Sequence, residues 1–196
     1  MSELNDLQDR LDTSEARNAL NNWVAITVAL ISVFMAVCKV KDDNIVQAML
    51  QAKSDQVDTW NEYQAKKLKQ HLAELGLNQV VALESMAPGK VSAPLAAQQK
   101  QYGDNIARYK VEEAKLADKA NAFGKQYDDL NYRDDQFDLS DATLAVSLAM
   151  LAITSLTGKR KLLYLALAFA FFGVVMGVAG LFGLALHPTA LVKALS

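Results

Sequence analysis

The sequence predicts an all-α membrane protein with three transmembrane helices and a long extramembrane antiparallel helical hairpin, coiled-coil-like, between spans one and two. Three observations predict this fold class. The chain is 52% hydrophobic with a net charge of -2, yet its apolar residues are concentrated in three blocks. A four-three helical repeat precedes and enters the second block. A Pro/Gly-rich stretch, MAPGKVSAP, divides the charged middle of the chain into two helical halves.

Residues 1–18 form a polar N-terminal tail with a weak helical pattern, and residues 19–40 form the first predicted transmembrane helix. The run WVAITVALISVFMAVC within it carries no charge, which suits a tilted span. Trp23 is suited to the headgroup level, and Lys39 can extend toward the other surface. The residue before the single cysteine, Cys38, is Val37 rather than the small residue of a lipoprotein cleavage site, and the flank before the apolar run is acidic rather than basic. We therefore expect an uncleaved membrane anchor rather than a signal peptide.

Residues 41–138 form the predicted hairpin, with its turn at about 86–94. In the first half, a loose helical face holds Val46, Met49, Val57, Trp60, Gln64, Leu68, Leu72 and Leu75. Because Val46, Val57 and Leu68 are eleven residues apart, this face favours a straight or slightly right-handed stripe rather than a strict heptad.

The second half of the hairpin carries a stricter heptad seam, whose apolar members are Tyr102, Ile106, Tyr109, Leu116, Phe123, Tyr127, Leu130 and Phe137. No proline occurs between Pro94 and Pro188, so one rigid helix of roughly sixty residues, about 90 Å long, is predicted from near Ala96 into the second span. The seam has more aromatic residues than one partner helix covers, which predicts a homo-oligomer. Its polar positions Glu113, Asp134 and Asp141 either face water or set the register of an oligomer.

Residues 139–157 and 162–186 are the second and third predicted transmembrane helices, joined by a basic loop over 158–161 and followed by a tail over 187–196. So short a loop predicts an antiparallel pair. Small residues including Gly173, Gly177 and Gly180 form a ridge on the third span, which favours close helix packing within the protomer or between protomers. The loop residues Lys159, Arg160 and Lys161 determine topology or contact lipid headgroups.

The predicted location is the bacterial inner (cytoplasmic) membrane. The three charges of the basic loop favour a cytoplasmic loop and a periplasmic hairpin. Lys39, Lys41, Lys53, Lys125 and Arg133 on the hairpin side favour the opposite orientation. We adopt the periplasmic hairpin.

Chemistry-bearing motifs are missing from the sequence. It contains no P-loop, dinucleotide fingerprint, nucleophile elbow or zinc spacing. His71 and Glu74 share a helix face, but two ligands do not make a metal site. The three spans have no charged residue in their interiors, and neither sign of charge dominates the chain enough to indicate a nucleic-acid partner. We therefore predict no enzyme, no catalytic residue, no cofactor and no metal.

Two short motifs carry a family resemblance: Asn22-Trp23-Val24 at the first span, and Trp60-x-x-Tyr63-Gln64-Ala65-Lys66 in the hairpin. With them, nearly the whole chain resembles an uncharacterised bacterial membrane-protein family, the domain of unknown function 4337. The resemblance implies the architecture above and no activity. Physically, Trp60, Tyr63, Gln64 and Lys66 either pack the two hairpin helices together or form a contact surface for another protein.

These features predict a non-enzymatic membrane scaffold that self-associates through its helical stalk and its small-residue transmembrane faces. Its expected partners are membrane lipids and further copies of the chain. The alternative is an oligomeric pore or transporter-accessory subunit with an acidic cluster at its mouth, formed by Asp128, Asp129, Asp134, Asp135 and Asp138.

Overall fold

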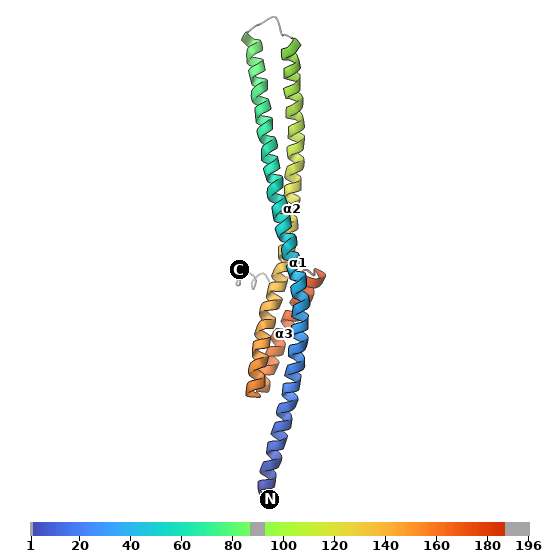
Figure 1. The fold of residues 1–196 in the computed structure, drawn as a ribbon, viewed down its shortest axis with the longest axis vertical. Coiled ribbons are helices and arrows are strands. Elements are labelled where there is room, and N and C mark those ends of the chain that lie inside the picture. The colour runs from blue at the N-terminus through green and yellow to red at the C-terminus, as the bar shows by residue number, and fades with distance from the viewer. Residues whose placement is uncertain (1, 87–92, 187–196) are drawn as a thin grey trace. The chain divides into compact units, whose positions relative to one another are not determined.

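The computed structural model describes residues 2–86 and 93–186, and within these ranges every regular element is an α-helix (Figure 1). The helices are α1 (Ser2–Met86), α2 (Ala93–Thr157) and α3 (Arg160–Phe182). Each contains a stretch long and apolar enough to cross a membrane. The prediction of an all-helical chain with three such stretches is confirmed.

The two long helices are uninterrupted. α1 extends over 85 residues, so the polar tail belongs to the same helix as the first span. α2 extends over 65 residues and continues through the second span, as the lack of proline predicts. Between them lies the predicted turn, of which residues 87–92 are outside the described part of the chain.

The connection between α2 and α3 is shorter than the predicted basic loop. Gly158 has a φ of +69°, and its N–H donates to the Thr154 carbonyl at 2.8 Å, which ends α2. Lys159 is the N-cap of α3, so Arg160 and Lys161 are already helical. The loop is therefore Gly158 and Lys159, because a single left-handed glycine is enough to reverse the chain.

The end of α3 also differs from the prediction, which extended the third span to residue 186, as far as His187–Pro188; these two residues lie outside the described part of the chain. The helix ends at Phe182, and Gly183 follows with a φ of +66°. The N–H groups of Gly183 and Leu184 both donate to the Ala179 carbonyl. A left-handed glycine after the last helical residue lets both N–H groups reach this carbonyl, and it ends the helix before the proline is reached.

The chain divides into two compact units, which we describe separately. The three-helix unit comprises residues 1–47 and 129–196, and the two-helix unit comprises Ala48–Asp128. In the two-helix unit α1 and α2 lie side by side and antiparallel (Figure 1). Contacts of Gln56 with Gly124, Lys66 with Glu112 and Gly76 with Tyr102 show this direction, since the numbers rise along α1 as they fall along α2.

The core of the three-helix unit is apolar, and it is formed by Val24, Ile31, Leu144, Leu151, Ala166 and Ala170. Polar side chains tie its helices together within this core and at its ends. The Ser147 hydroxyl donates to the Ala166 carbonyl at 2.8 Å, and Ser155 donates to the Asn21 side chain at 3.1 Å. Such side-chain hydrogen bonds between helices are typical of helices packed in lipid.

Candidate functional site

The predicted contact surface does not face one way: some of its residues lie toward α2 and others toward solvent. Its residues are Trp60, Tyr63, Gln64 and Lys66. Trp60 and Tyr63 are half-buried, and their rings meet edge to face with centroids 5.3 Å apart. Lys66 contacts α2, whereas Gln64 is exposed. Both interpretations of the motif therefore have residues that fit them, and a contact with another protein stays a prediction.

Lys66 and Glu112 form an ion pair between α1 and α2, with 2.7 Å between Nζ and Oε2. This pairing lowers the pKa of Glu112 and raises the pKa of Lys66, in both cases chiefly through the hydrogen bond between them. The pair lies at the surface, so it contributes little to stability.

The predicted oligomer seam lies along the face of α2 that packs on α1. In the two-helix unit its members are half-buried: Tyr102, Ile106, Tyr109, Leu116, Phe123 and Tyr127. Tyr102 lies against Gly76 of α1, and Tyr127 receives Lys53 of α1 over its ring at 5.5 Å. In the three-helix unit Leu130 is half-buried and Phe137 is buried. The seam has an intramolecular partner, and its role between chains stays a prediction.

The buried face of α1 in the two-helix unit is not the one that the apolar pattern indicated. Its buried residues are small or polar for the most part: Met49, Ala52, Thr59, Gln70, Ala73 and Val80. They follow a four-three spacing that a search for large apolar residues overlooks. Of the predicted face, Met49 is buried and Trp60 half-buried, while Val57, Leu68 and Leu72 are exposed.

The exposed side of α1 carries a second repeat, which we call the outer stripe. Its positions follow steps of three, four and four, and all are exposed: Leu50, Lys53, Val57, Asn61, Gln64, Leu68, Leu72, Leu75, Gln79, Leu83 and Met86. Apolar residues occupy most of these positions, and the side chains of Leu50, Leu68 and Leu72 are 66%, 61% and 59% exposed. The eleven-residue period noted in the sequence belongs to this stripe.

The three glycines of α3 are buried within the three-helix unit. A Cβ at Gly173 would lie 2.6 Å from Leu144, and one at Gly180 would lie 2.9 Å from Phe137. At Gly177 it would lie 2.7 Å from the Ser140 hydroxyl and 2.8 Å from the Phe34 ring. The ridge packs on α1 and α2 of the same chain, so of its two predicted roles the one within the protomer is observed.

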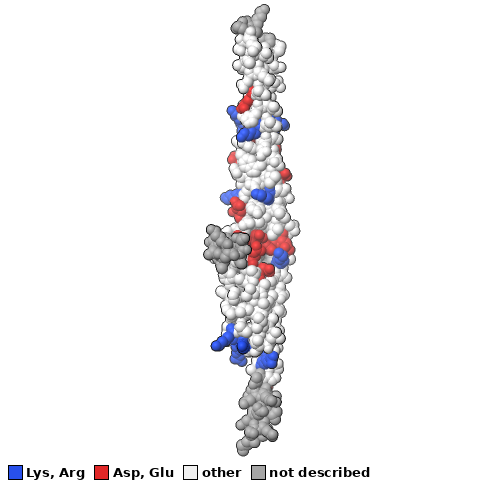
Figure 2. All heavy atoms as spheres, turned by 90° about the vertical axis from the view of Figure 1, so that its left-hand side faces the viewer, with Lys and Arg blue, Asp and Glu red and all other residues white. Residues whose placement is uncertain are grey.

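The basic group of Lys159, Arg160 and Lys161 is exposed. Figure 2 shows a group of Lys and Arg side chains separated by an uncharged stretch of surface from a patch of Asp and Glu side chains. Charge on either side of an uncharged band is the pattern expected of a membrane-spanning surface.

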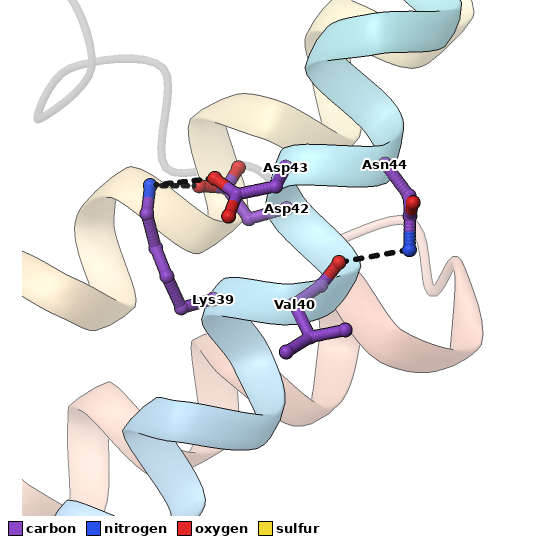
Figure 3. Close-up of polar contacts among 5 residues, drawn as sticks. All are labelled: Lys39, Val40, Asp42, Asp43 and Asn44. Atoms are coloured by element: carbon purple, nitrogen blue, oxygen red, sulfur yellow. Dashed lines mark hydrogen bonds and ion pairs between the residues drawn. The ribbon is translucent and has the colours of Figure 1, made fainter.

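Acidic residues of α1 and α2 meet in the three-helix unit around a cavity of about 30 Å³. It is lined by Met35, Cys38, Lys39, Asp42, Phe137, Asp138, Ser140 and Asp141. Lys39 donates to Asp42 Oδ2 at 2.8 Å and lies 3.3 Å from Asp43 (Figure 3). On another side of the same helix, Asn44 donates to the Val40 carbonyl at 2.9 Å. Within the described part of the chain, Asp42 Oδ1 and Ser140 Oγ are buried and receive no hydrogen bond from an N–H or hydroxyl group.

The acidic residues beside this cavity perturb one another. Burial, then a hydrogen bond with Asp42 and repulsion from Asp138, raises the pKa of Asp134 to about 6. Burial, followed by repulsion from Asp42 and Asp135, raises the pKa of Asp138. The Arg133 guanidinium donates to the Gly180 and Leu181 carbonyls. Of the predicted acidic cluster, Asp134, Asp135 and Asp138 thus lie around one site, whereas Asp128 falls in the other unit.

Among the described residues, no group of three or more His, Cys, Asp or Glu side chains is placed to hold a metal ion. The His71 ring lies 3.1 Å from Glu74, as its spacing predicted, and Gln70 donates to the same carboxylate. His187 lies outside the described residues.

Comparison with known proteins gives one match. The family described as "Domain of unknown function (DUF4337)" matches residues 20–183, which includes all three predicted spans except their outermost residues. No curated protein and no solved structure matches the chain.

Proposed function

The chain belongs to the family DUF4337, which is described as a domain of unknown function, so a functional proposal has to rest on the surfaces of the protein. We propose that it is a non-enzymatic membrane scaffold whose copies associate side by side. In this proposal the three apolar stretches cross the bacterial inner membrane. The two-helix unit is then an extramembrane hairpin on the periplasmic side.

The outer stripe of α1 is the observation that carries this proposal. From Leu50 to Met86 it extends along about 54 Å of helix, at about 1.5 Å per residue. A helix in water normally turns its apolar residues to the core, and a long exposed apolar strip marks an interaction surface. The two-helix unit therefore lacks a covering surface, which a partner would supply.

A second copy of this chain is the partner that fits the stripe. Residues that meet their own copies across a two-fold axis must be able to pair with themselves. Leucines do so by packing, and the amides of Asn61, Gln64 and Gln79 do so because each has both a donor and an acceptor. Lys53 is the single charged position on the stripe, so like-charge repulsion is small.

The membrane would fix the direction of this association. Copies inserted in the same orientation present the same stripe at the same height, so their α1 helices pair in parallel and in register. Buried amides in such a repeat are known to specify register. The eleven-residue period favours straight or right-handed pairing.

In this proposal the main contact between copies is the outer stripe of α1, and not the seam of α2 or the glycine ridge of α3. The glycine ridge of α3 and the seam of α2 both have partners within the chain, which supports the outer stripe as the principal contact between copies. Gln64 lies on the outer stripe and Trp60 lies one helical turn before it. Part of the Trp60-x-x-Tyr63-Gln64-Ala65-Lys66 motif would then lie at the contact between copies.

Cysteine cross-linking of full-length protein in mild detergent tests the proposal. In a Cys38→Ala background, Leu68→Cys or Leu75→Cys should give rapid disulfide-linked dimers, because parallel in-register helices place each residue beside its own copy. Val111→Cys is the matched control, since Val111 is 56% exposed on α2, away from the stripe. A monomeric mass in mild detergent, equal cross-linking at Val111, or a different protein occupying the stripe would each overturn it.

The alternative function, an oligomeric pore or transporter-accessory subunit, is favoured by the acidic patch alone (Figure 2). It predicts cation flux into liposomes that decreases with Asp138→Asn and persists with Glu62→Gln in the two-helix unit. Flux equal to that of empty liposomes would exclude it.

A further inference from the structure

The acidic cavity of the three-helix unit contains two buried oxygens that need a ligand. Asp42 is 6% exposed and Ser140 is 1% exposed, and among the described residues Asp42 Oδ1 and Ser140 Oγ have no hydrogen-bond donor once Asp134, which faces Asp42, is ionised. A buried polar atom without a partner costs about 1–3 kcal/mol. Lys39 contacts the other oxygen of Asp42, which leaves Oδ1 for a ligand inside the cavity. We propose that this cavity binds a monovalent cation of the size of Na⁺, held by Asp42 Oδ1 and Ser140 Oγ.

The charge of the lining favours a cation over a water molecule. Asp42, Asp138 and Asp141 line the cavity, and Lys39 is the one basic residue that does so among the described residues. Both helices contribute to this imbalance, α1 through Asp42 and α2 through the other two carboxylates. A water molecule satisfies the two orphan oxygens but leaves the repulsion between the helices, whereas a cation reduces it.

The size and the donor set favour a monovalent ion. A cavity of about 30 Å³ accommodates an ion and about one water molecule. Ca²⁺ requires six to eight oxygen ligands, commonly several carboxylates, and Mg²⁺ requires a regular octahedron. The two orphan oxygens carry one negative charge between them, which a single positive charge balances, and the described residues hold no convergent group of three acidic, His or Cys ligands for a divalent ion.

The test is thermal unfolding of the full-length protein in mild detergent at constant ionic strength, with NaCl replacing choline chloride. The buffer is alkaline, because an ionised Asp134 has no proton to donate to Asp42. We expect Na⁺ to raise Tm saturably, by about 3 °C or more when the site is full. Ser140→Ala and Asp42→Asn should abolish this shift. Asp43→Asn is the matched control, because Asp43 is the next residue, also contacts Lys39 and is 58% exposed outside the cavity.

Cys38 supplies a second readout that needs no substitution at the site. Its thiol lines the same cavity, so a bound ion should slow its alkylation about threefold or more relative to choline. Equal Tm and equal alkylation rates in Na⁺ and choline would show that the cavity holds water only, and would overturn the proposal. Displacement of Na⁺ by micromolar Ca²⁺ or Mg²⁺ would overturn the monovalent assignment.

Discussion

α3 in the three-helix unit and α1 in the two-helix unit are packed by the same rule in what we propose are different surroundings. α3 buries small residues such as Ala166 and Gly173 and turns Phe171 outward, 73% exposed. α1 likewise buries Ala52 and Ala73 and turns leucines outward. In lipid, outward apolar side chains cost nothing, because the lipid tails are equally apolar. In water they forfeit about 25 cal/mol for each Å² left exposed. If the two-helix unit lies outside the membrane, as we propose, a single copy would therefore leave an apolar face in water.

The largest expected effect comes from placing a large side chain in the tightly packed core of the three-helix unit. Gly177→Leu would place its side chain against Ser140 and Phe34, where even a Cβ would lie within 2.8 Å. We expect the free energy of unfolding to decrease by about 3 kcal/mol or more, because the backbone of an overpacked core must shift. Thermal unfolding in detergent measures it. If Gly177→Leu unfolds at the wild-type temperature, α3 is not packed as described.

The next effect would be on association rather than folding. Leu68→Asp combined with Leu72→Asp should weaken self-association about 100-fold or more, since two apolar contacts would become like-charge contacts between copies. Analytical ultracentrifugation in density-matched detergent measures it. Val111→Asp, on the exposed side of α2, is the control that should leave the mass unchanged. An unaltered mass for the double variant would mean that the outer stripe is not the contact.

A smaller effect, of opposite sign, is expected at a glycine of the two-helix unit. Gly103 is helical, and a Cβ there would meet nothing within 4 Å. Gly103→Ala should therefore raise the free energy of unfolding by about 0.5–1 kcal/mol, by reducing the entropy of the unfolded chain. Denaturant unfolding followed by circular dichroism measures it. A destabilised variant would show that the Gly103 side of α2 is covered by another copy, which would sharpen the comparison.

The smallest effect concerns pH. The Lys66–Glu112 pair lowers the pKa of Glu112 below its ordinary 4.5, so its contribution to stability is present above that pH and is lost as the pH falls through the lowered pKa. Glu112→Gln should remove this part of the acid-side loss of Tm. Glu62→Gln, on the same unit, should not. Identical acid-side profiles for wild type and Glu112→Gln would show that the pair does not hold the two helices.

The sequence was sufficient to predict where the long helices lie, but not which face of each helix is buried. Proline and glycine positions locate the break between α1 and α2, and the heptad seam locates the face of α2 that packs inward. The inward face of α1 was missed, because hydrophobicity was read as burial. Thr59, Gln70 and Ala73 are buried because they are small or can hydrogen-bond locally, and Thr59 donates to the Asp55 carbonyl at 2.6 Å. Their four-three spacing was the available signal.

The acidic cavity could be predicted only in part. The carboxylates near the second span were noted as a cluster, but Asp42 lies about ninety residues earlier in the chain. Only the packing of α1 on α2 brings it to them, and no local pattern encodes that pairing. Ser140 carries no signal at all, since a serine at the start of an apolar stretch within a helix is ordinary. The helix termini at Gly158 and Gly183 were open to prediction, because glycine favours left-handed conformations there.

The carbonyls at the end of α3 are held by side chains of α2. Arg133 donates to Gly180 at 2.9 Å, and Gln136 donates to Leu184 and Leu186 at 2.8 and 2.6 Å. In lipid, a helix pinned in this way loses the freedom to slide along its neighbour. A bilayer thicker or thinner than the apolar stretch is then met by tilting the unit as one body. Membrane thickness would thereby change the inclination of α2 and α3 together, and with it the direction in which α2 leaves the bilayer.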